Sequence, residues 1–414
     1  MSTSSNTPLT AGTRNLLPLK HVLPWVAAIV VLLLLPHIFD SRSALTIMNQ
    51  MAITIVFALS YNMLLGQGGM LSFGHAVYMG LGGFFAMHIL NWVETDELWL
   101  PLPLLPIFGG LFGLLFAFLI GSFSTRRAGT VFAMISLGVG ELVASSALII
   151  VMFFGGEEGI SGDRTMGPPL LNWDFGPLYQ VYYLTAFWLV LAALGMFLYS
   201  RTPIGRITNA VRDNEERAEF LGYSQRNVRW ISFCASGFFA GIAGALFAIN
   251  FEILTEENLN LVTSGNILLV TFLGGVGFFA GPIIGAIVFT LLQTVLSLYT
   301  EIWALYLGIL FVATVMFFLR GWPGFWRCTG CRGSSAGRDY WWCLTPRCCC
   351  RHCWRSLAVL RRWRFCSTCA IRVWGIMKWI FMASPSTAIH HLPLALPLWR
   401  QRSGFSSPSG WHRG

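Results

Sequence analysis

Charged residues are scarce in this sequence. They make up 11% of its 414 residues, whereas 55% of the residues are hydrophobic, and the mean hydropathy is +0.64. Soluble globular domains carry about 25% charged residues, so this composition excludes an ordinary soluble protein. We therefore predict an all-α integral membrane protein, built as a polytopic bundle of transmembrane helices.

Lysine is almost absent, and with it the phosphate-binding loop of ATPases. The chain has only Lys20 and Lys378, and neither stands in a G-x-x-x-x-G-K-[ST] motif. The H-E-x-x-H and G-x-S-x-G motifs of hydrolases are also missing before residue 327. These absences predict a protein that is not an enzyme, binds no cofactor of its own and takes its energy from a partner.

The first 326 residues contain almost no cysteine and no excess of positive charge. This part holds Cys234 alone, with 13 Lys/Arg against 17 Asp/Glu. Residues 327–414 hold the other nine cysteines, with 14 Lys/Arg against a single acidic residue. No disulfide framework therefore supports the membrane part, and the formal net charge of +9 belongs to the tail.

The tail at 327–414 is rich in Cys, Arg and Trp and shows no helix or strand period. Its C-x-x-C pairs at 328–331 and 366–369 have zinc-knuckle spacing, and basic, aromatic composition also occurs in nucleic-acid-binding segments. Three adjacent cysteines at 348–350 fit one tetrahedral site poorly. The abrupt change in composition favours an out-of-frame product, or else a disordered basic extension near anionic lipid. We expect no metal and no nucleic acid there.

Apolar runs long enough to span a bilayer, roughly 20 residues, recur along the first part. Single spans are expected at 22–39, 46–65, 71–92, 102–124, 128–154, 182–200, 230–250 and 303–320. A polar lead at 1–21 precedes the first apolar run, and no cleavage-site pattern follows that run. We therefore expect a retained first helix rather than a signal peptide. These single spans and the apolar run at 265–298 add up to a prediction of about 8–10 spans.

The run at 265–298 is too long for one span, because an α-helix rises 1.5 Å per residue. We expect GGVGFFAGPIIG (274–285) to break it into two limbs. The positive-inside rule supports the break. Arg126, Arg127 and the arginines of 201–229 fall on one side, assigned as cytoplasmic, and the break returns Arg320 to that side.

Glycines and polar side chains interrupt the apolar sequence between residues 61 and 83, which read YNMLLGQGGMLSFGHAVYMGLGG. The polar side chains of interest are Asn62, Gln67, Ser72 and His75. Glycine allows helices to break or to approach closely, and polar groups in hydrocarbon need partners. The pattern predicts a broken or closely packed helix beside a water-filled path, although each side chain alone is equally consistent with a hydrogen bond inside the bundle.

Glu141 is the one carboxylate well inside an expected span. A buried ionised carboxylate is costly unless it is paired or protonated. We therefore place Glu141 with the candidate substrate-pathway residues. The alternative is a hydrogen bond between two helices of the interior.

The largest cytoplasmic segment, at 201–229, is dense in polar residues. Acidic and basic side chains recur three or four residues apart, and Pro203, Gly205 and Gly222 punctuate it. This pattern predicts short amphipathic helices arranged as a helix-turn-helix hairpin. Such a hairpin either lies in solvent or docks a partner.

Four segments in order resemble those of one transporter family. Tyr61-Asn62 precedes GQGGMLSFGHA (66–76), and GGEEGISG (155–162), GRITNAVRDNEERAEFLG (205–222) and GGVGFFAGPIIGA (274–286) follow. Together they resemble the M-type permease subunits of branched-chain amino acid ABC transporters, the LivM family. The resemblance covers about residues 20–326, with small departures such as Gly69-Met70.

The resemblance implies a permease domain at 22–326, multi-pass in a bacterial inner (plasma) membrane, that forms the pathway for Leu, Ile and Val with a paralogous permease subunit. It also implies a periplasmic substrate-binding protein and two cytoplasmic ATPase subunits, which bind ATP and Mg. The segment 205–222 would then couple to an ATPase. The expected contacts are Gly205, Arg206, Arg212, Asp213, Asn214, Glu215, Ala218, Glu219, Leu221 and Gly222.

Two other functions fit the sequence. Similar permeases carry urea, short amides or other amino acids, and the sequence does not separate these substrates. A membrane receptor or anchor could also use the 201–229 segment to recruit a cytoplasmic partner without transport. The polar groups at 61–83 argue against an anchor, which needs no polar groups inside its helices.

Overall fold

The computed structural model describes residues 19–317, except residues 40, 96, 98, 128, 166–174 and 301. The beginning of the polar lead and the whole tail at 327–414 lie outside the described residues, so the interpretations of that tail stay predictions. The regular structure of the described part is helical apart from two short strands. This confirms the prediction of an all-α membrane protein.

Seven helices of the described part are long and apolar enough to cross a membrane. They are α2 (Arg42–Asn62) with its extension η1 (Met63–Gln67), α3 (Ala76–Glu94), η2 (Leu102–Leu104) with α4 (Leu105–Ser124), α5 (Thr130–Ile149), α7 (Leu178–Arg201), α10 (Gln225–Phe251) and α12 (Gly281–Tyr299). The other helices are α1 (Leu19–Ile38), α6 (Val151–Phe154), α8 (Pro203–Asp213), α9 (Glu215–Phe220), η3 (Glu256–Asn258), α11 (Leu261–Gly274) and α13 (Trp303–Phe317). The strands β1 (Ile160–Ser161) and β2 (Ile253–Leu254) pair antiparallel.

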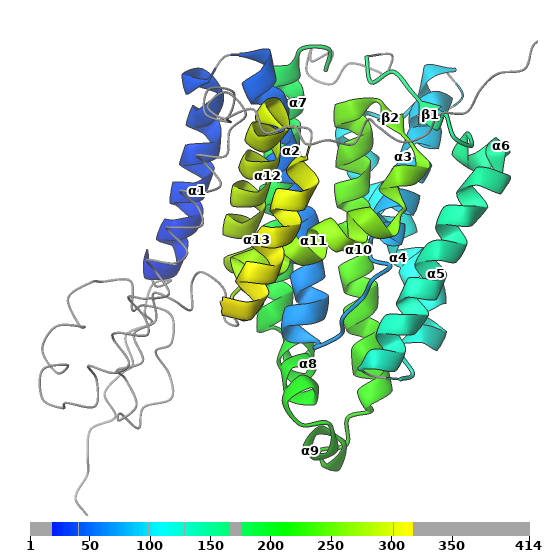
Figure 1. The fold of residues 1–414 in the computed structure, drawn as a ribbon, viewed down its shortest axis with the longest axis vertical. Helices are drawn as coiled ribbons and strands as arrows, with labels where there is room; N and C mark the ends of the chain where they lie inside the picture. The colour runs from blue at the N-terminus through cyan, green and yellow to red at the C-terminus, as the bar shows by residue number, and fades with distance from the viewer. Residues whose placement is uncertain are drawn as a thin grey trace, which may run out of the picture. The chain divides into compact units, whose positions relative to one another are not determined.

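The ends of the bundle agree with the sidedness deduced from charge. Figure 1 shows α8 and α9 protruding from one end of the bundle and the β1–β2 pair at the opposite end. The arginine-rich segment forms the first end, which we take as cytoplasmic, and the acidic loops form the second, which we take as external.

The apolar run at 265–298 breaks where the sequence predicted. α11 ends at Gly274 and α12 begins at Gly281. Between them Gly275 has a φ of +96°, a conformation that residues with a side chain rarely adopt. Pro282 lies in the first turn of α12, where a missing N–H breaks no helical hydrogen bond. The two limbs therefore form a hairpin rather than one tilted span.

The core lies where α10 packs on α3 and α4, the most extensive helix contacts of the described part. Gly82 of α3, Gly109 of α4 and Gly241 of α10 meet there. A methyl group on Gly82 would lie 2.6 Å from the Cα of Gly241, and one on Gly109 would lie 3.0 Å from the Gly241 carbonyl oxygen. Backbone thus packs on backbone, which is how helices associate in a membrane when small residues line the contact.

Candidate functional site

The long helix α2 is interrupted close to its cytoplasmic end. It ends at Asn62, a π-helical turn follows at Met63–Gln67, and α3 begins only at Ala76. π-helical turns inside helices often mark functional sites. Of the two expected alternatives, a broken helix or a closely packed one, the structure shows the break. We call residues 60–76 the polar segment.

Neighbouring helices hold the backbone of the polar segment. The hydroxyl of Tyr61 donates to the carbonyl of Ser72 at 2.9 Å. The N–H of Phe73 donates to the Ser136 hydroxyl of α5 at 3.0 Å, and the N–H of Ala76 donates to the Ser264 hydroxyl of α11 at 3.0 Å. Hydroxyls from two other helices thus replace the hydrogen bonds that the broken helix gives up.

His75 lies inside the bundle, and one of its ring nitrogens has no hydrogen-bond partner among the described residues. It is 1% exposed, and its ring centroid lies 5.5 Å from that of Phe57 and 5.2 Å from that of Tyr61. Its Nε2 lies 3.2 Å from the Ser60 hydroxyl, which itself donates to the Phe57 carbonyl at 2.7 Å. Because that hydroxyl proton is already used, Nε2 must donate to Ser60. Nδ1 is then left as an acceptor.

The four side chains that the sequence nominated within the segment share one property. Each has a buried polar atom without a hydrogen-bond partner in the described part: Asn62 Oδ1, Gln67 Oε1, Ser72 Oγ and His75 Nδ1. An unpaired polar group in an apolar environment costs a few kcal/mol. The segment is therefore suited to water or a polar solute, which would supply the missing hydrogen bonds.

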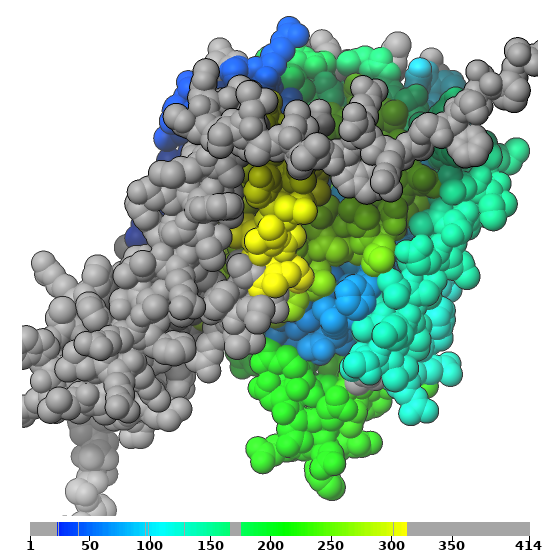
Figure 2. All heavy atoms as spheres, viewed as in Figure 1, coloured from blue at the N-terminus to red at the C-terminus, as the bar shows by residue number. Residues whose placement is uncertain are grey.

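The polar segment reaches the molecular surface on one face. In Figure 2, blue atoms from the end of α2 and the chain that follows it are visible between α5 (teal) and α13 (yellow). Gly69 in the segment is exposed. The segment therefore lines a face of the bundle as well as its interior.

Glu141 does not join this cluster. It is exposed on α5, whereas its neighbour Gly140 is buried. Gly140 lies against Gly74 of the polar segment: a methyl group on Gly74 would be 3.4 Å from the Cα of Gly140. α5 therefore buries the side that carries Gly140 on the polar segment and turns Glu141 outward. The expectation that Glu141 lies in the interior of this chain is wrong, because α5 is an edge helix that buries only a narrow face.

Two buried carboxamides were not predicted from the sequence. Asn49 of α2 is 0% exposed and Asn250 of α10 is 7% exposed. Neither amide group has a partner among the described residues. Asn49 stands eleven residues before Ser60, which is three helical turns and places both on one face of α2. That spacing could have identified Asn49, whereas no comparable signal marks Asn250.

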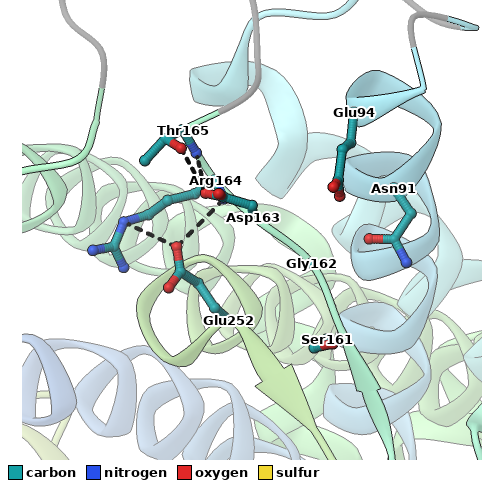
Figure 3. A pocket seen from close by; sticks show the side chains of 8 residues that line it. All are labelled: Asn91, Glu94, Ser161, Gly162, Asp163, Arg164, Thr165 and Glu252. Atoms are coloured by element: carbon teal, nitrogen blue, oxygen red, sulfur yellow. Dashed lines mark hydrogen bonds and ion pairs between the residues drawn. The ribbon is translucent and has the colours of Figure 1, made fainter.

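A polar pocket opens at the external end of the bundle, beside β1 and β2. Its volume is about 630 Å³. Figure 3 shows the lining residues, which come from α3, from β1 and the chain after it, and from the end of α10. They are Asn91, Glu94, Ser161, Gly162, Asp163, Arg164, Thr165 and Glu252.

The pocket carries negative charge. Asp163 accepts from the backbone N–H and the hydroxyl of Thr165 at 2.8 and 2.7 Å, and these bonds lower its pKa below the ordinary value. The carboxylate therefore stays ionised at neutral pH. Glu94 and Glu252 also line the pocket, so its lining holds three carboxylates and one arginine, Arg164. This electrostatic balance favours cationic or ammonium-bearing groups.

Arg164 supports the pocket wall. Its side chain is 10% exposed, and its Nε lies 3.5 Å from a carboxylate oxygen of Glu252. The guanidinium also donates, at 2.9 to 3.3 Å, to the backbone carbonyls of Phe175, Gly176, Ile249 and Asn250. The last two belong to the final turn of α10, whose carbonyls attract cations. Arg164 therefore ties the external loop to the end of the central helix.

We expect Arg164→Met to lower the melting temperature of the detergent-solubilised protein by about 5 °C or more. The change leaves several buried carbonyls without a donor and removes the ion pair with Glu252, which keeps the backbone N–H of residue 164. We expect a loss of about 3 kcal/mol. Differential scanning fluorimetry measures the shift. Arg127→Met, at an exposed arginine, is the matched control. Equal melting temperatures for both variants would contradict the supporting role.

The cytoplasmic segment folds into two short helices, α8 and α9, as predicted. The Thr202 hydroxyl accepts from the N–H of Gly205 at 3.3 Å and caps α8. The side chain of Asn214 accepts from the N–H of Arg217 at 3.0 Å and caps α9. Both are N-cap bonds of the usual kind, and Asn214 also ends α8.

The inner face of this hairpin holds it together. Ala218 is 3% exposed and packs with Val211 and Val228. Glu215 forms an ion pair with Arg229, which is 6% exposed. Ala218 is therefore not available to a partner, contrary to the expectation from the sequence, because the short helix α9 turns it toward α8 and α10.

The outer tip of the hairpin is apolar and exposed. Phe220 is 89% exposed and Leu221 is 72% exposed. Leu221 was predicted as a contact and Phe220 was not, although an aromatic residue in such a polar loop is itself a signal. Of the other predicted contacts, Gly205 is buried and the following are exposed: Arg206, Arg212, Asp213, Asn214, Glu215, Glu219 and Gly222.

Comparison with known proteins places most of the chain in one family. The matching family model is described as branched-chain amino acid transport system / permease component, and it covers residues 43–319. The high-affinity branched-chain amino acid transport system permease protein LivM of Escherichia coli (strain K12) is 28% identical over 311 residues, which are 70% of this chain and 72% of that protein. LivM of Salmonella typhimurium is 29% identical over 295 residues, 66% of this chain and 68% of that protein.

A more distant likeness is partial. The autoinducer 2 import system permease protein LsrC of Klebsiella pneumoniae is 36% identical over 119 residues, 27% of this chain and 35% of that protein. No solved structure matches the chain. The family match contains the polar segment, the external pocket and the α8–α9 hairpin. The chain is a multi-pass membrane protein that belongs to the family of branched-chain amino acid transport system permease components.

Proposed function

We propose that this chain is a permease subunit of an ATP-binding-cassette importer that carries Leu, Ile and Val across a bacterial inner membrane. A paralogous permease subunit completes the pathway, two cytoplasmic ATPase subunits bind ATP and Mg, and a periplasmic binding protein delivers the substrate. Family membership and the names of the two LivM relatives support the choice of substrate.

The polar segment is the observation that carries this proposal. A branched-chain amino acid is a zwitterion with an apolar side chain, so its path must offer hydrogen bonds without a strong charge that would hold it. Asn62, Gln67, Ser72 and His75 offer amide, hydroxyl and imidazole groups whose buried atoms have no partner in the described part. A protein that only anchored a partner would not leave such groups unpaired inside apolar helices.

The outer parts of the molecule have roles in the same proposal. The external pocket, with three carboxylates, meets the binding protein and attracts the ammonium group of the arriving substrate. Glu141 faces outward from α5, so it reaches the pathway only where the paralogous subunit covers α5. The α8–α9 hairpin docks the ATPase through its exposed tip.

Radiolabelled leucine uptake tests the proposed function. A tagged copy of this chain is purified from its host with the subunits that accompany it, and the assembly is placed in proteoliposomes with its binding protein and ATP. We expect uptake that requires ATP and is competed by isoleucine and valine. Competition by urea or short amides, with no effect of isoleucine or valine, would overturn the choice of substrate.

Replacement of Gln67 tests the pathway. We expect Gln67→Leu to lower leucine uptake roughly tenfold, because one hydrogen bond to a polar solute contributes about 1 kcal/mol or somewhat more. Gln50→Leu, the same change on a half-buried residue of α2, serves as the control. Equal uptake by the two variants, at equal amounts of assembled protein, would show that Gln67 lies outside the pathway.

A further inference from the structure

At Gly66, in the π-helical turn, the polar segment meets both the α11–α12 hairpin and helix α8. A methyl group on Gly66 would lie 2.6 Å from the carbonyl oxygen of Val276, in the chain between α11 and α12. It would also overlap the side chain of Asn62, which donates to the carbonyl of Phe278 at 3.4 Å. The turn is therefore wedged against the α11–α12 hairpin, and displacement of either one must move the other.

Arg212 reaches this point from the cytoplasmic hairpin. It lies in the last turn of α8, and its Nη1 donates to the carbonyl of Gly66. Its aliphatic stem lies on Gly69, where a methyl group would be 2.6 Å from the Cγ of Arg212. The other side of the guanidinium binds Asp213, with Nη2 and Nε at 2.9 and 3.0 Å from Oδ1. Arg212 thus contacts the membrane part by a hydrogen bond and by packing.

Side-chain contacts hold together the hairpin that carries Arg212. Ala218, Val211 and Val228 form its small apolar core, and the Glu215–Arg229 ion pair joins α9 to the start of α10. The exposed Phe220 and Leu221 lie at its tip. A force on this tip is therefore passed to α8 and to the start of α10, to which Val228 and Arg229 belong.

We propose that Arg212 is the positioning residue that transmits displacement of the α8–α9 hairpin to the π-helical turn at Gly66, and through it to the polar segment and the α11–α12 hairpin. This inference rests on the proposed function, in which an ATPase docks on the hairpin. It also adds to the role expected from the sequence, because the side chain of Arg212, although partly exposed, bonds to the membrane part.

Three variants separate the hydrogen bond from the packing. Arg212→Met keeps an unbranched stem against Gly69 and removes the donor, whereas Arg212→Lys keeps a cationic donor. Arg226→Met is the matched control, because Arg226 is an exposed arginine at the start of α10, outside the expected ATPase contacts. The measured quantities are co-purification of the ATPase, ATP hydrolysis, and leucine taken up per ATP hydrolysed in proteoliposomes.

We expect Arg212→Met to retain the ATPase and its hydrolysis but to lower leucine uptake per ATP at least fivefold. Arg212→Lys should restore part of this ratio, and Arg226→Met should leave it unchanged. A protein that merely folds poorly lowers uptake and hydrolysis together and leaves their ratio unaltered. An unchanged ratio in Arg212→Met, or loss of the ATPase from that variant, overturns the inference.

A second measurement keeps this test separate from the test of the proposed function. Hydrogen exchange of peptides covering residues 63–70 is followed in the assembly with and without ATP. We expect exchange to respond to ATP in the unmodified chain and in Arg226→Met, but not in Arg212→Met. If no ATPase accompanies the unmodified chain, the proposed function fails. If the ATPase is present and the response persists in Arg212→Met, only the role of Arg212 fails.

Discussion

Gly244→Ala is expected to reduce the amount of folded bundle at least fivefold. Gly244 lies in α10 at its contact with α3. A methyl group there would overlap the carbonyl oxygen of Met79 and lie 2.9 Å from the backbone nitrogen of Gly83. Both are main-chain atoms of α3, which cannot turn aside as a flexible side chain can. Insertion of a methyl group into a packed core costs about 1–3 kcal/mol. Because the methyl group would overlap main-chain atoms at the central helix contact, we expect a cost at or above the upper limit of this range.

Size-exclusion chromatography of a fluorescent fusion in mild detergent measures the outcome. We expect the monodisperse peak of Gly244→Ala to fall at least fivefold relative to the unmodified chain. Gly265→Ala is the matched control, because no described atom outside its own helical turn lies within 4 Å of a methyl group at that residue of α11. A normal peak for Gly244→Ala, with an unchanged melting temperature, would show that α3 and α10 do not pack as closely as described.

The helices could be predicted because hydrocarbon imposes one strong rule on the backbone. Polar main-chain groups must be bonded within the span, so apolar length locates each helix to within a few residues. The break between α11 and α12 was also predictable, because Gly275 and Pro282 have strong local preferences. The short β1–β2 pair was not, since it depends on two external loops meeting rather than on the sequence of either.

The composition of the polar segment was readable from the sequence, but the direction of individual side chains was not. Asn62, Gln67, Ser72 and His75 stand out as polar residues in an apolar run. By contrast, Ala218 turns inward and Glu141 turns outward because of how short or edge helices pack on their neighbours. Such rotations depend on tertiary contacts, to which helical periodicity alone is insensitive.

Arg164 and Arg212 show why the arginines were the hardest residues to interpret. From the sequence alone, both look like charged residues of solvent-exposed segments outside the membrane. In the structure Arg164 ties an external loop to the end of α10, and Arg212 ties α8 to the turn at Gly66. Each bonds to backbone carbonyls, which every residue has, so no particular residue type marks the partner. The guanidinium group suits this role because its five donors serve several carbonyls at once.

Replacement of Phe220 and Leu221 by Asp is expected to remove the ATPase from the assembly and with it leucine uptake. Both side chains are largely exposed, and burial of a Phe or Leu side chain on a partner contributes about 1.5–3 kcal/mol. Loss of both contacts should weaken association by at least a hundredfold, since about 1.4 kcal/mol corresponds to a factor of ten. Co-purification of the ATPase with the tagged chain, followed by uptake in proteoliposomes, measures the effect.

The matched control for this pair is the apolar double variant Phe220→Leu with Leu221→Met, which should retain the ATPase. Membrane insertion and the melting temperature should be unaffected in both variants, because the packing of Ala218 with Val211 and Val228 does not involve the tip. Normal co-purification with the Asp variant would mean that the hairpin meets its partner elsewhere. The exposed charged residues around Arg206 would then be the surface to replace next, and the tip would have no part in transmitting force to Arg212.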